Sequence, residues 1–377
     1  MKTVKMFVPK PSLQYTLYKS KEHKPKTNKK RKNKNIKKRS SANVAMDPPF
    51  HEAYKTLLAE TAAEAKGTSD VVTVEEWDLP VVDLGRLTGG KVEEEEECKN
   101  DIIRASKEWG FFQVVNHGIS NQLLAKMRAK QIELFKQPFE RKSKEDQFSN
   151  FSAGSYRWGT PSATSITQLS WSEAFHVSLS DILGSNYGSD DDLRSTMEEY
   201  AGKVSRLAQK LAEILGENLG RSSKFFIENC VPSTCYLRMN RYPPCPVQGQ
   251  IFGLMPHTDS DFLTILHQDQ VGGLELVKDG KWIAVKPNPQ ALIVNIGDLF
   301  QVWSNDEYKS VEHRVVTNSR KERYSIAYFL CPWSETVIKS KSEPGVYRRF
   351  SFREFRNQVQ EDVRKYGYKI GLPRFVL

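Results

Sequence analysis

The sequence has no long apolar run and few cysteines, and each absence excludes a class of protein. No stretch of 18 or more apolar residues occurs in the 377 residues, so we expect no membrane-spanning helix. The five cysteines are an odd number, and no two of them have C-x-x-C spacing. This pattern argues against a disulfide scaffold or a zinc finger and favours a reduced, intracellular protein.

Acidic and apolar residues are scarce at the N-terminus. Residues 1–45 hold 15 Lys/Arg and one acid, so they carry +14, whereas the remaining 41 basic and 45 acidic residues give −4. Such a segment cannot bury enough surface to fold alone. We therefore expect a disordered basic extension over residues 1–46. A nuclear-import or nucleic-acid-contacting arm is the alternative, and a secretory signal is not expected because no apolar core follows the first lysines.

The rest of the chain has ordinary composition, with 38% hydrophobic and 27% charged residues overall, and is long enough to bury a large core. Short strands are expected at 79–84 and 110–115. Helices are expected from Glu93 to Trp109, over 119–136, over 191–219 and from Ser351 onward. Ser351 and Glu354 form a capping box, and the expected buried face of that last helix is Phe352, Phe355, Val359 and Val363.

After Cys230 the pattern changes to short β-rich runs separated by turn residues. The expected strands are 235–239, 262–266, 274–277, 282–285, 291–296, 310–316 and 324–330, with a turn at 295–298. Many short strands at this spacing indicate a jelly roll or barrel. The fold class expected is therefore α+β, with a β core flanked by helices.

Three residues in this β-rich region have the spacing of metal ligands. Side chains two apart in a strand share a face, so His257 and Asp259 can reach one ion, and His313 lies 54 residues further on. Alone, each piece is weak, since a single His-x-Asp or a single histidine is more often structural. Together they match the two-histidine, one-carboxylate set of non-haem Fe(II) oxygenases.

A possible anion site follows the last of these histidines. Arg323 offers a planar, permanently charged fork suited to a carboxylate, and Ser325, on the same strand face, adds a hydroxyl donor.

An aromatic segment precedes the β-rich region. Residues 155–163 (SYRWGTPSA) and 169–176 (LSWSEAFH) interleave aromatics with a cation and small residues. They could wall a pocket for a flat, acidic, largely apolar substrate, or be a loop packed on the core by its tryptophans.

These motifs resemble the plant soluble 2-oxoglutarate- and Fe(II)-dependent dioxygenases. The metal motif, Arg-x-Ser, and the Asn-x-Tyr-x-x-Cys signature at 240–245 all match, and the likeness covers about residues 77–375. It implies a double-stranded β-helix core, with an N-terminal dioxygenase region at 77–190, a supporting helix at 191–230, the core at 231–335 and a helical segment at 336–377. It also implies Fe(II) on His257, Asp259 and His313, with 2-oxoglutarate on Tyr242, Arg323 and Ser325. Dioxygen would be the other co-substrate and ascorbate the reductant.

Residues 155–163, 169–176 and 235–245 (CYLRMNRYPPC) are more closely similar to gibberellin 2-oxidases acting on twenty-carbon gibberellins. The resemblance implies hydroxylation of this diterpenoid hormone at carbon 2, which inactivates it. Tyr156, Arg157 and Trp158 are the expected substrate contacts, with Arg157 as the cation for a carboxylate. The protein is expected to be a cytoplasmic or nuclear monomer that binds neither membrane nor nucleic acid.

Three alternatives stay open at this point. Another dioxygenase of the same family, such as a gibberellin 20-oxidase or a flavonoid oxygenase, would share the catalytic core. A zinc hydrolase could use the same three ligands, but it has no need of Arg323 and Ser325. A nucleic-acid-binding protein acting through the basic arm would bind in a strongly salt-dependent way.

Overall fold

The computed structural model describes residues 45–64, 74–144, 154–160, 163–184, 191–222, 224–247, 251–340 and 344–377. Residues 44–377 form one compact unit. The basic extension expected at 1–46 lies almost wholly outside the described residues. The finer division at 77, 191, 231 and 336 stays a prediction. No helix in the described part of the chain is long and apolar enough to cross a membrane.

The helices occur mainly before and after the β-rich region. They are α1 (Phe50–Ala53), α2 (Lys55–Glu64), α3 (Val92–Glu108), α4 (Asn121–Phe135), α5 (Phe139–Ser143), α6 (Leu179–Leu183), α7 (Asp191–Asn218), α8 (Lys224–Asn229), α9 (Asp298–Trp303) and α10 (Phe352–Tyr366). Single turns of 3-10 helix lie at Leu84–Leu87, Ile166–Gln168 and Leu372–Arg374. The four long helices expected from the sequence are thus present at α3, α4, α7 and α10.

The strands form two mixed sheets and one small pair. They are β1 (Glu76–Trp77), β2 (Val81–Asp83), β3 (Phe111–Val115), β4 (Tyr156–Trp158), β5 (Glu173–Ser178), β6 (Tyr236–Tyr242), β7 (Phe252–His257), β8 (Leu263–Gln268), β9 (Leu274–Lys278), β10 (Lys281–Val285), β11 (Leu292–Ile296), β12 (His313–Val316), β13 (Arg323–Leu330), β14 (Val337–Ile338) and β15 (Phe350–Ser351). The larger sheet has the order β2-β3-β11-β8-β13-β6-β5-β4, and the smaller β1-β10-β9-β12-β7. The pairs β1–β10 and β2–β3 are parallel and the other pairs are antiparallel.

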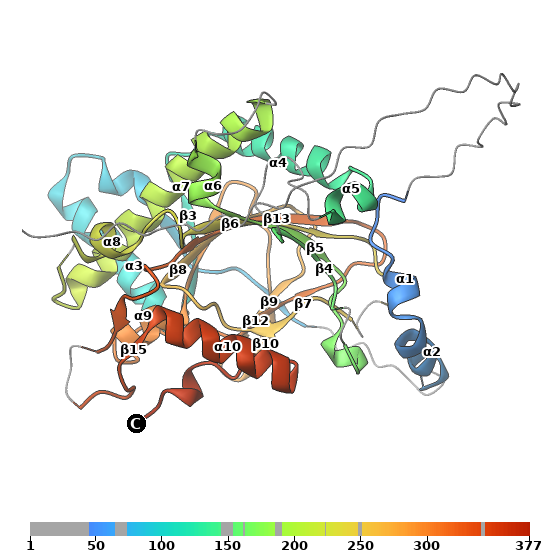
Figure 1. Ribbon diagram of the computed structural model, residues 1–377. Coiled ribbons are helices and arrows are strands. Elements are labelled where there is room, and N and C mark those ends of the chain that lie inside the picture. The colour runs from blue at the N-terminus through green and yellow to red at the C-terminus, as the bar shows by residue number, and fades with distance from the viewer. Residues whose placement is uncertain are drawn as a thin grey trace, which may run out of the picture. The chain divides into compact units, whose positions relative to one another are not determined.

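The centre of the larger sheet is covered on both faces. Every residue of β13 and of β11 is buried, which explains why both strands read as nearly continuous apolar runs. On the outer face, α7 packs against β8 and β13, and α3 and α4 pack against α7. Figure 1 shows α7 and α4 on one side of the sheet and α10 on the other side. The α+β class expected from the sequence is confirmed.

The apolar stripe of α7 explains how it covers the sheet. Met197, Val204, Leu211 and Leu215 are buried, and Leu193 and Leu207 are half-buried against the same cluster. The six positions recur at helical spacing, so one face of α7 points at the sheet. The prediction that this stripe is core is confirmed.

The segment before β1 is fixed to the body by aromatic contacts. The Phe50 ring stacks on Trp171 with centroids 4.6 Å apart. The Tyr54 hydroxyl donates to the Ser170 carbonyl (3.2 Å) and accepts from the Thr160 N–H (2.6 Å). Phe50 and Tyr54 are both fully buried, so α1 and the start of α2 are anchored to the body of the protein.

Two local expectations differ from the structure. The turn expected at 295–298 is the end of β11 followed directly by α9, because Gly297 acts as the N-cap of that short helix. The aromatic segment at 155–176 contains β4 and β5, which extend the larger sheet beside β6. Its tryptophans pack against Phe50, which favours the core-packing alternative for this segment.

Candidate metal centre

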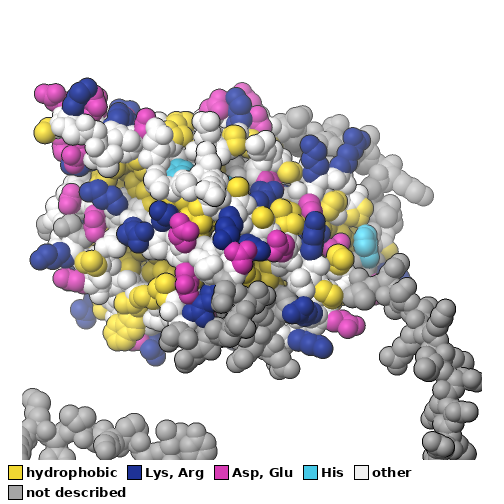
Figure 2. Space-filling view, turned by 90° about the horizontal axis from the view of Figure 1, so that it is seen from above, with side chains coloured by type: hydrophobic (Ala, Val, Ile, Leu, Met, Phe, Trp, Pro, Cys, Tyr) yellow, Lys and Arg dark blue, Asp and Glu magenta, His cyan; other side chains and the backbone are white. Residues whose placement is uncertain are grey.

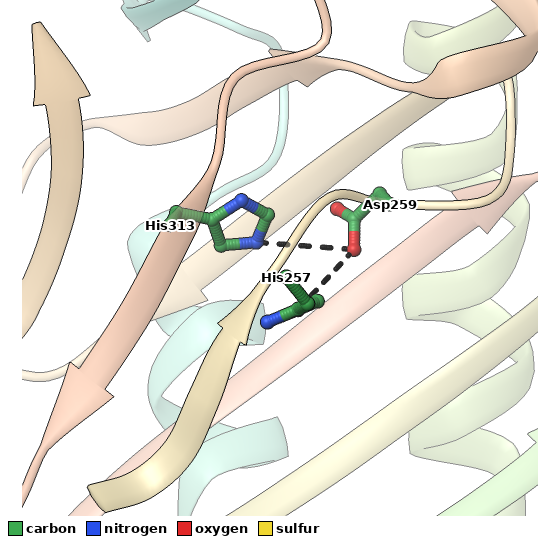
Figure 3. Close-up of side chains that lie close together, drawn as sticks. All are labelled: His257, Asp259 and His313. Atoms are coloured by element: carbon green, nitrogen blue, oxygen red, sulfur yellow. Dashed lines mark ion pairs between the residues drawn. The ribbon is translucent and has the colours of Figure 1, made fainter. Parts of the chain in front are cut away.

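Two of the three expected metal ligands lie on paired strands of the smaller sheet, and the third follows in a loop. His257 is the last residue of β7, His313 is the first residue of β12, and the two are paired across the antiparallel ladder. Asp259 follows two residues after His257, in the loop that leaves β7 (Figure 3). The pairing brings the imidazole centroids to 4.3 Å, a contact that sequence spacing alone did not determine.

The side chains converge on one point. The Asp259 Oδ1 atom lies 3.6 Å from His257 Nε2 and 3.8 Å from His313 Nε2, and the three ligand atoms lie within 4.8 Å of one another (Figure 3). Two nitrogens and one oxygen at these separations can bind one first-row metal ion on a single face. They are the one such group among the described residues.

The backbone sets the orientation of both imidazoles. His257 Nδ1 lies 2.8 Å from the Met255 carbonyl, and His313 Nδ1 lies 3.0 Å from the Val311 carbonyl. Since a carbonyl only accepts, Nδ1 carries the hydrogen in each ring and donates it. Each Nε2 lone pair is then free to face the shared centre, as is typical of metal-bound histidines.

Two polar residues hold the carboxylate of Asp259. Its Oδ2 atom accepts from Thr264 Oγ1 at 2.6 Å and from Asn295 Nδ2 at 2.8 Å. Burial alone would raise the pKa of Asp259, but electrostatic interaction with the neighbouring His313 and His257 and these two hydrogen bonds lower it to about 2. The carboxylate is therefore ionised at neutral pH, with Oδ1 directed toward the imidazoles.

The His257 imidazole is uncharged at neutral pH. Burial, followed by electrostatic interaction with the neighbouring His313, lowers the pKa of His257 to about 3. An uncharged imidazole is the form that binds a metal ion, so no proton has to be displaced from this ring at neutral pH.

The triad opens into a cavity of about 360 Å³ between the two sheets. Its lining contains Phe111, Tyr236, Arg238, Asn240, Tyr242, Leu254, His257, Thr258, Asp259, Ser260, Thr264, Leu266, Leu274, Asn295, His313, Val315, Arg323, Ser325, Ala327, Phe329, Val359, Val363 and Lys369. The larger sheet contributes one wall, β7, β9 and β12 the other, and α10 covers part of the opening. Val363, expected in the buried face of α10, is 46% exposed and lines the cavity.

Arg323 lies in the same cavity as the triad. Its Nη2 donates to Gln268 Oε1 at 2.8 Å and its Nη1 to Ser325 Oγ at 3.4 Å, while its guanidinium lies over the Tyr242 ring, 4.9 Å from the centroid. The side chain is 2% exposed, and among the described residues its Nε has no hydrogen-bond partner and no carboxylate lies within 4.0 Å. A buried cation without a counter-charge is costly. The residues present therefore fit an anionic ligand beside the metal centre.

Tyr156, Arg157 and Trp158 lie on β4, and none of the three is on the cavity lining. The Tyr156 hydroxyl donates to Glu173 Oε2 at 2.5 Å, inside a buried polar cluster. Trp158 packs edge-on against Phe50 and Phe139. Arg157 is exposed. The described lining of the cavity at the triad comes from other elements, among them β6, β13 and α10.

Sequence reasoning missed the residues that support the site. Thr264 and Asn295, which hold Asp259, face each other across the β8–β11 pair. Gln268, which holds Arg323, faces Ser325 across the β8–β13 pair. Alternation along each strand could have placed them on a face, but only the strand order brings them to the ligands.

Two mixed sheets enclosing a two-histidine, one-carboxylate centre define a non-haem iron oxygenase. The sequence agrees with this class. Residues 233–332 match the 2OG-Fe(II) oxygenase superfamily, and residues 79–197 match the N-terminal region described as non-haem dioxygenase in morphine synthesis. The chain belongs to the 2OG-Fe(II) oxygenase superfamily, an enzyme family that uses Fe(II) and 2-oxoglutarate.

Within this superfamily, the chain is similar to several gibberellin oxidases. The chain is 60% identical to gibberellin 2-beta-dioxygenase 8 of Arabidopsis thaliana, over 88% of this chain and 99% of that protein. It is 49% identical to gibberellin 2-beta-dioxygenase 6 of Oryza sativa subsp. japonica, over 89% of this chain and 97% of that one. Gibberellin 20 oxidase 3 of Arabidopsis thaliana is more distant, at 34% identity over 72% of this chain and 74% of the relative.

Solved structures are also similar to this chain. JOX2, in complex with 2OG, Fe and JA, is similar with a TM-score of 0.63 and 30% identity, over 84% of this chain and 94% of that one. A dioxygenase for auxin oxidation from rice has a TM-score of 0.64 and 29% identity, over 80% of this chain and 100% of that one.

Proposed function

We propose that this dioxygenase hydroxylates gibberellins at carbon 2 and so inactivates the hormone or its precursors, with twenty-carbon gibberellins as substrates. The observation that supports this proposal best is the 60% identity to a gibberellin 2-beta-dioxygenase over 99% of that relative's length. We also propose that the two facing sheets correspond to the double-stranded β-helix of the superfamily, with the metal centre between them.

In this proposal His257, Asp259 and His313 hold the iron. Bound Fe(II) supplies the activation of dioxygen, driven by the oxidative decarboxylation of 2-oxoglutarate to succinate. The protein fixes three donors on one side of the centre through the Met255 and Val311 carbonyls and through Thr264 and Asn295. The opposite side is left to co-substrate and substrate.

Arg323 is the proposed anchor for the far carboxylate of 2-oxoglutarate. Its charge is buried and held in place by Gln268 and Ser325, so a carboxylate that binds there finds a preoriented donor. The Ser325 hydroxyl is within reach of the same ligand, and Tyr242 lines the same end of the cavity. A zinc hydrolase with these three metal ligands would have no use for this buried cation.

Part of the remaining lining is apolar. Phe111 packs edge-on against the His313 ring at 5.1 Å, and Leu254, Leu274 and Val315 line the wall formed by the smaller sheet. An apolar wall of this kind suits a terpenoid body and prevents side reactions of a strong oxidant with solvent.

Two alternatives are weaker. A gibberellin 20-oxidase or a flavonoid oxygenase would share the metal and 2-oxoglutarate sites, but gibberellin 20 oxidases are 33–35% identical to this chain. Nucleic-acid binding would depend on the basic extension. Figure 2 shows Lys/Arg and Asp/Glu side chains interspersed over the face that carries α7, so the described part of that face presents no continuous basic surface.

We further propose that the enzyme acts as a monomer in the cytoplasm, with access to the nucleus left to the basic extension. Size-exclusion chromatography with light scattering tests the first statement, and localisation of the full chain and of a chain starting at Met46 tests the second.

Product analysis tests the proposed reaction. The full chain is incubated with Fe(II), ascorbate, 2-oxoglutarate and a panel of twenty-carbon and nineteen-carbon gibberellins, and products are identified by mass spectrometry against authentic standards. We expect 2-hydroxylated products and stoichiometric succinate. Products oxidised only at carbon 20, or turnover of flavonoids alone, would contradict the proposal.

A further inference from the structure

The floor of the cavity is an ordered row of side chains on two paired strands. Residues two apart on β6 share a face, and Tyr242, Asn240, Arg238 and Tyr236 all line the cavity. Across the β6–β13 pair they lie opposite Arg323, Ser325, Ala327 and Phe329 in that order. The row therefore runs from the 2-oxoglutarate end, at Tyr242 and Arg323, to an aromatic end at Tyr236 and Phe329.

Three cations line the described part of the cavity. One of them has a proposed anionic ligand, and a second forms an ion pair within the protein. Arg323 is the proposed 2-oxoglutarate anchor. The Lys369 ammonium lies 2.6 Å from the Asp298 carboxylate and donates to the Thr258 carbonyl at 2.9 Å, so its charge is already paired. Asp259, the one carboxylate among the described lining residues, belongs to the metal centre. Arg238 is the remaining cation.

Arg238 is held so that one edge of its guanidinium is free. Its Nε donates to Asn240 Oδ1 at 2.9 Å, and the Asn240 amide in turn donates to Ser325 Oγ at 3.4 Å. Among the described residues, neither terminal nitrogen of Arg238 has a hydrogen-bond partner. The side chain is half-buried on the cavity wall. Two parallel N–H donors on the free edge match the two oxygens of a carboxylate.

An apolar platform lies beside this free edge. The rings of His176, Tyr236 and Phe329 form a continuous stack, with centroids 3.8 Å apart between the first two and 4.5 Å apart between the last two. His176 lies directly opposite Arg238 in the β5–β6 pair. Partial desolvation, followed by the positive charges of Arg238, Arg356 and Arg157, lowers the pKa of His176, whose side chain is still exposed. The ring is therefore uncharged at neutral pH and adds aromatic surface rather than a fourth positive charge.

We infer that Arg238 binds the carboxylate of the hydroxylated substrate, with the apolar body of that substrate lying on Tyr236 and Phe329. The ligand class is an apolar carboxylic acid. Arg238 is four residues from Tyr242, about 13 Å along the strand, which separates the substrate carboxylate from the 2-oxoglutarate anchor. Ala327 faces Arg238 across the sheet and leaves space for the ligand. Arg238 would thereby determine which part of the substrate faces the metal centre.

This inference rests on the proposed function, because it takes the substrate to be an apolar acid oxidised at this centre. Its test compares Arg238→Gln, Arg238→Lys and a matched control, Arg157→Gln, which removes a nearby arginine that lies outside the cavity. Each protein is assayed with a gibberellin and with its fully methyl-esterified form, and KM is measured separately for gibberellin and for 2-oxoglutarate. Thermal unfolding of each variant checks that it folds.

We expect Arg238→Gln to raise KM for the acid by about ten- to a hundredfold, the loss of a charge-assisted hydrogen-bond pair. The 2-oxoglutarate KM should change by less than about threefold, a difference that general misfolding would not produce. Arg238→Lys should lie in between, because it keeps the charge and loses the fork. Arg157→Gln should resemble the parent protein. The parent should prefer acid to ester by about tenfold or more, and Arg238→Gln should lose that preference.

The outcomes separate the two proposals. If acid and ester are hydroxylated equally well by the parent, or if Arg157→Gln raises the acid KM and Arg238→Gln does not, the inference about Arg238 is wrong while the proposed function stands. If gibberellins are not hydroxylated but another apolar acid is, with the same dependence on Arg238, the proposed function is wrong and the inference stands. The ester comparison uses the parent protein, so it can contradict the inference even if Arg238→Gln does not fold.

Discussion

At the scale of single residues, each donor of the metal centre depends on a partner that fixes the atom it presents. The Met255 and Val311 carbonyls accept the Nδ1 hydrogens of the two histidines, and Thr264 and Asn295 occupy the outer oxygen of Asp259. The partners come from the backbone and from the larger sheet. The geometry of the centre is therefore set before any metal binds, and loss of one donor should not disturb the strands that hold the others.

The first prediction concerns His313. Replacing it by alanine removes one of the three donors but leaves β12 paired with β7 and β9, so we expect a folded protein that binds Fe(II) weakly. Turnover should fall by more than about a hundredfold, since changes even to residues that orient metal ligands cost 10–100-fold. Iron content after anaerobic loading, 2-oxoglutarate turnover and thermal unfolding are measured together.

His117→Ala is the matched control for this prediction. His117 lies outside the metal centre, and its Nδ1 accepts from the Ile119 N–H at 3.2 Å. This variant should keep iron and turnover. Full activity in His313→Ala, or loss of iron in His117→Ala, would contradict the assignment of the triad.

A second prediction concerns the shape of the anion site. Arg323→Lys keeps the positive charge but cannot donate to Gln268 and Ser325 while presenting a fork to a carboxylate. We expect KM for 2-oxoglutarate to rise about ten- to a hundredfold, which corresponds to the roughly 1.5–3 kcal/mol of one charge-assisted hydrogen bond. Iron binding and the gibberellin KM should change far less.

The control for Arg323→Lys is Arg320→Lys, on the exposed approach to the same strand. It makes the same chemical change outside the cavity and should leave both KM values unaltered. If Arg323→Lys instead raises the gibberellin KM and leaves the 2-oxoglutarate KM unchanged, then Arg323 binds the gibberellin and the co-substrate site has been misassigned.

At the scale of elements, α10 contributes side chains both to the main core and to the lining of the cavity. Phe352 and Phe355 are buried in the main core, whereas Val359 and Val363 line the cavity. Ser351 caps the helix by accepting from the Glu354 N–H at 3.1 Å. In a complete capping box the Glu354 side chain would also accept from the Ser351 N–H. Here the Glu354 carboxylate instead forms an ion pair with Arg348 at 2.8 Å. Gly367, with φ of 81°, ends the helix in the left-handed conformation.

A third prediction tests the cap. Ser351→Ala leaves the Glu354 N–H without its acceptor, and loss of such a cap costs about 1 kcal/mol of folding free energy. Ser351→Asn supplies another capping oxygen and should restore most of that stability. Urea unfolding followed by circular dichroism measures both. Equal stability of all three proteins would show that water replaces the cap at no cost.

At the scale of the whole molecule, residues 47–54 are held to the body by buried contacts. Phe50 and Tyr54 are buried against Trp171 and the Ser170 carbonyl, and Asp47 lies 2.6 Å from Arg241. Arg241 also binds Glu173, which pairs with the fully buried Lys142. These contacts fall within residues 47–54, whereas the basic residues that dominate the net charge lie before them.

The fourth prediction uses two truncations. A chain that starts at Met46 should keep the thermal midpoint and turnover of the full chain, because the removed residues have too few apolar side chains to add a core. A chain that starts at Lys55 also loses Phe50 and Tyr54, and loss of a buried aromatic costs about 3–5 kcal/mol. Thermal and urea unfolding compare the three. A large loss in the first truncation would give the basic extension a structural role.

Much of the fold could be read from local patterns. The apolar stripe of α7, the cap of α10 and most of the short strands after Cys230 depend on residues close in sequence, so periodicity was enough to find them. β1, β4, β5, β14 and β15 were missed, and of β7 only the end at His257 was expected, in a strand that was wrongly extended to Asp259. β4 and β5 lie in an aromatic segment without clear alternation, and the burial of β7 is intermediate along most of its length, so an apolar pattern is weak.

The candidate site also has residues that the sequence predicted and residues that it did not. The order and spacing of His257, Asp259, His313, Arg323 and Ser325 are properties of the chain, and they were sufficient to predict a centre that the structure then brings together. The substrate end was predicted at Tyr156, Arg157 and Trp158, but the cavity is lined instead by Tyr236, Arg238 and Phe329. The physical reason is that alternation along a strand assigns a side chain to a face, whereas its neighbours are decided by which strands pair and in which register. The sequence alone determined the chemistry of the donors, and the pairing of β7 with β12 and of β5, β6 and β13 decided which side chains share the cavity with them.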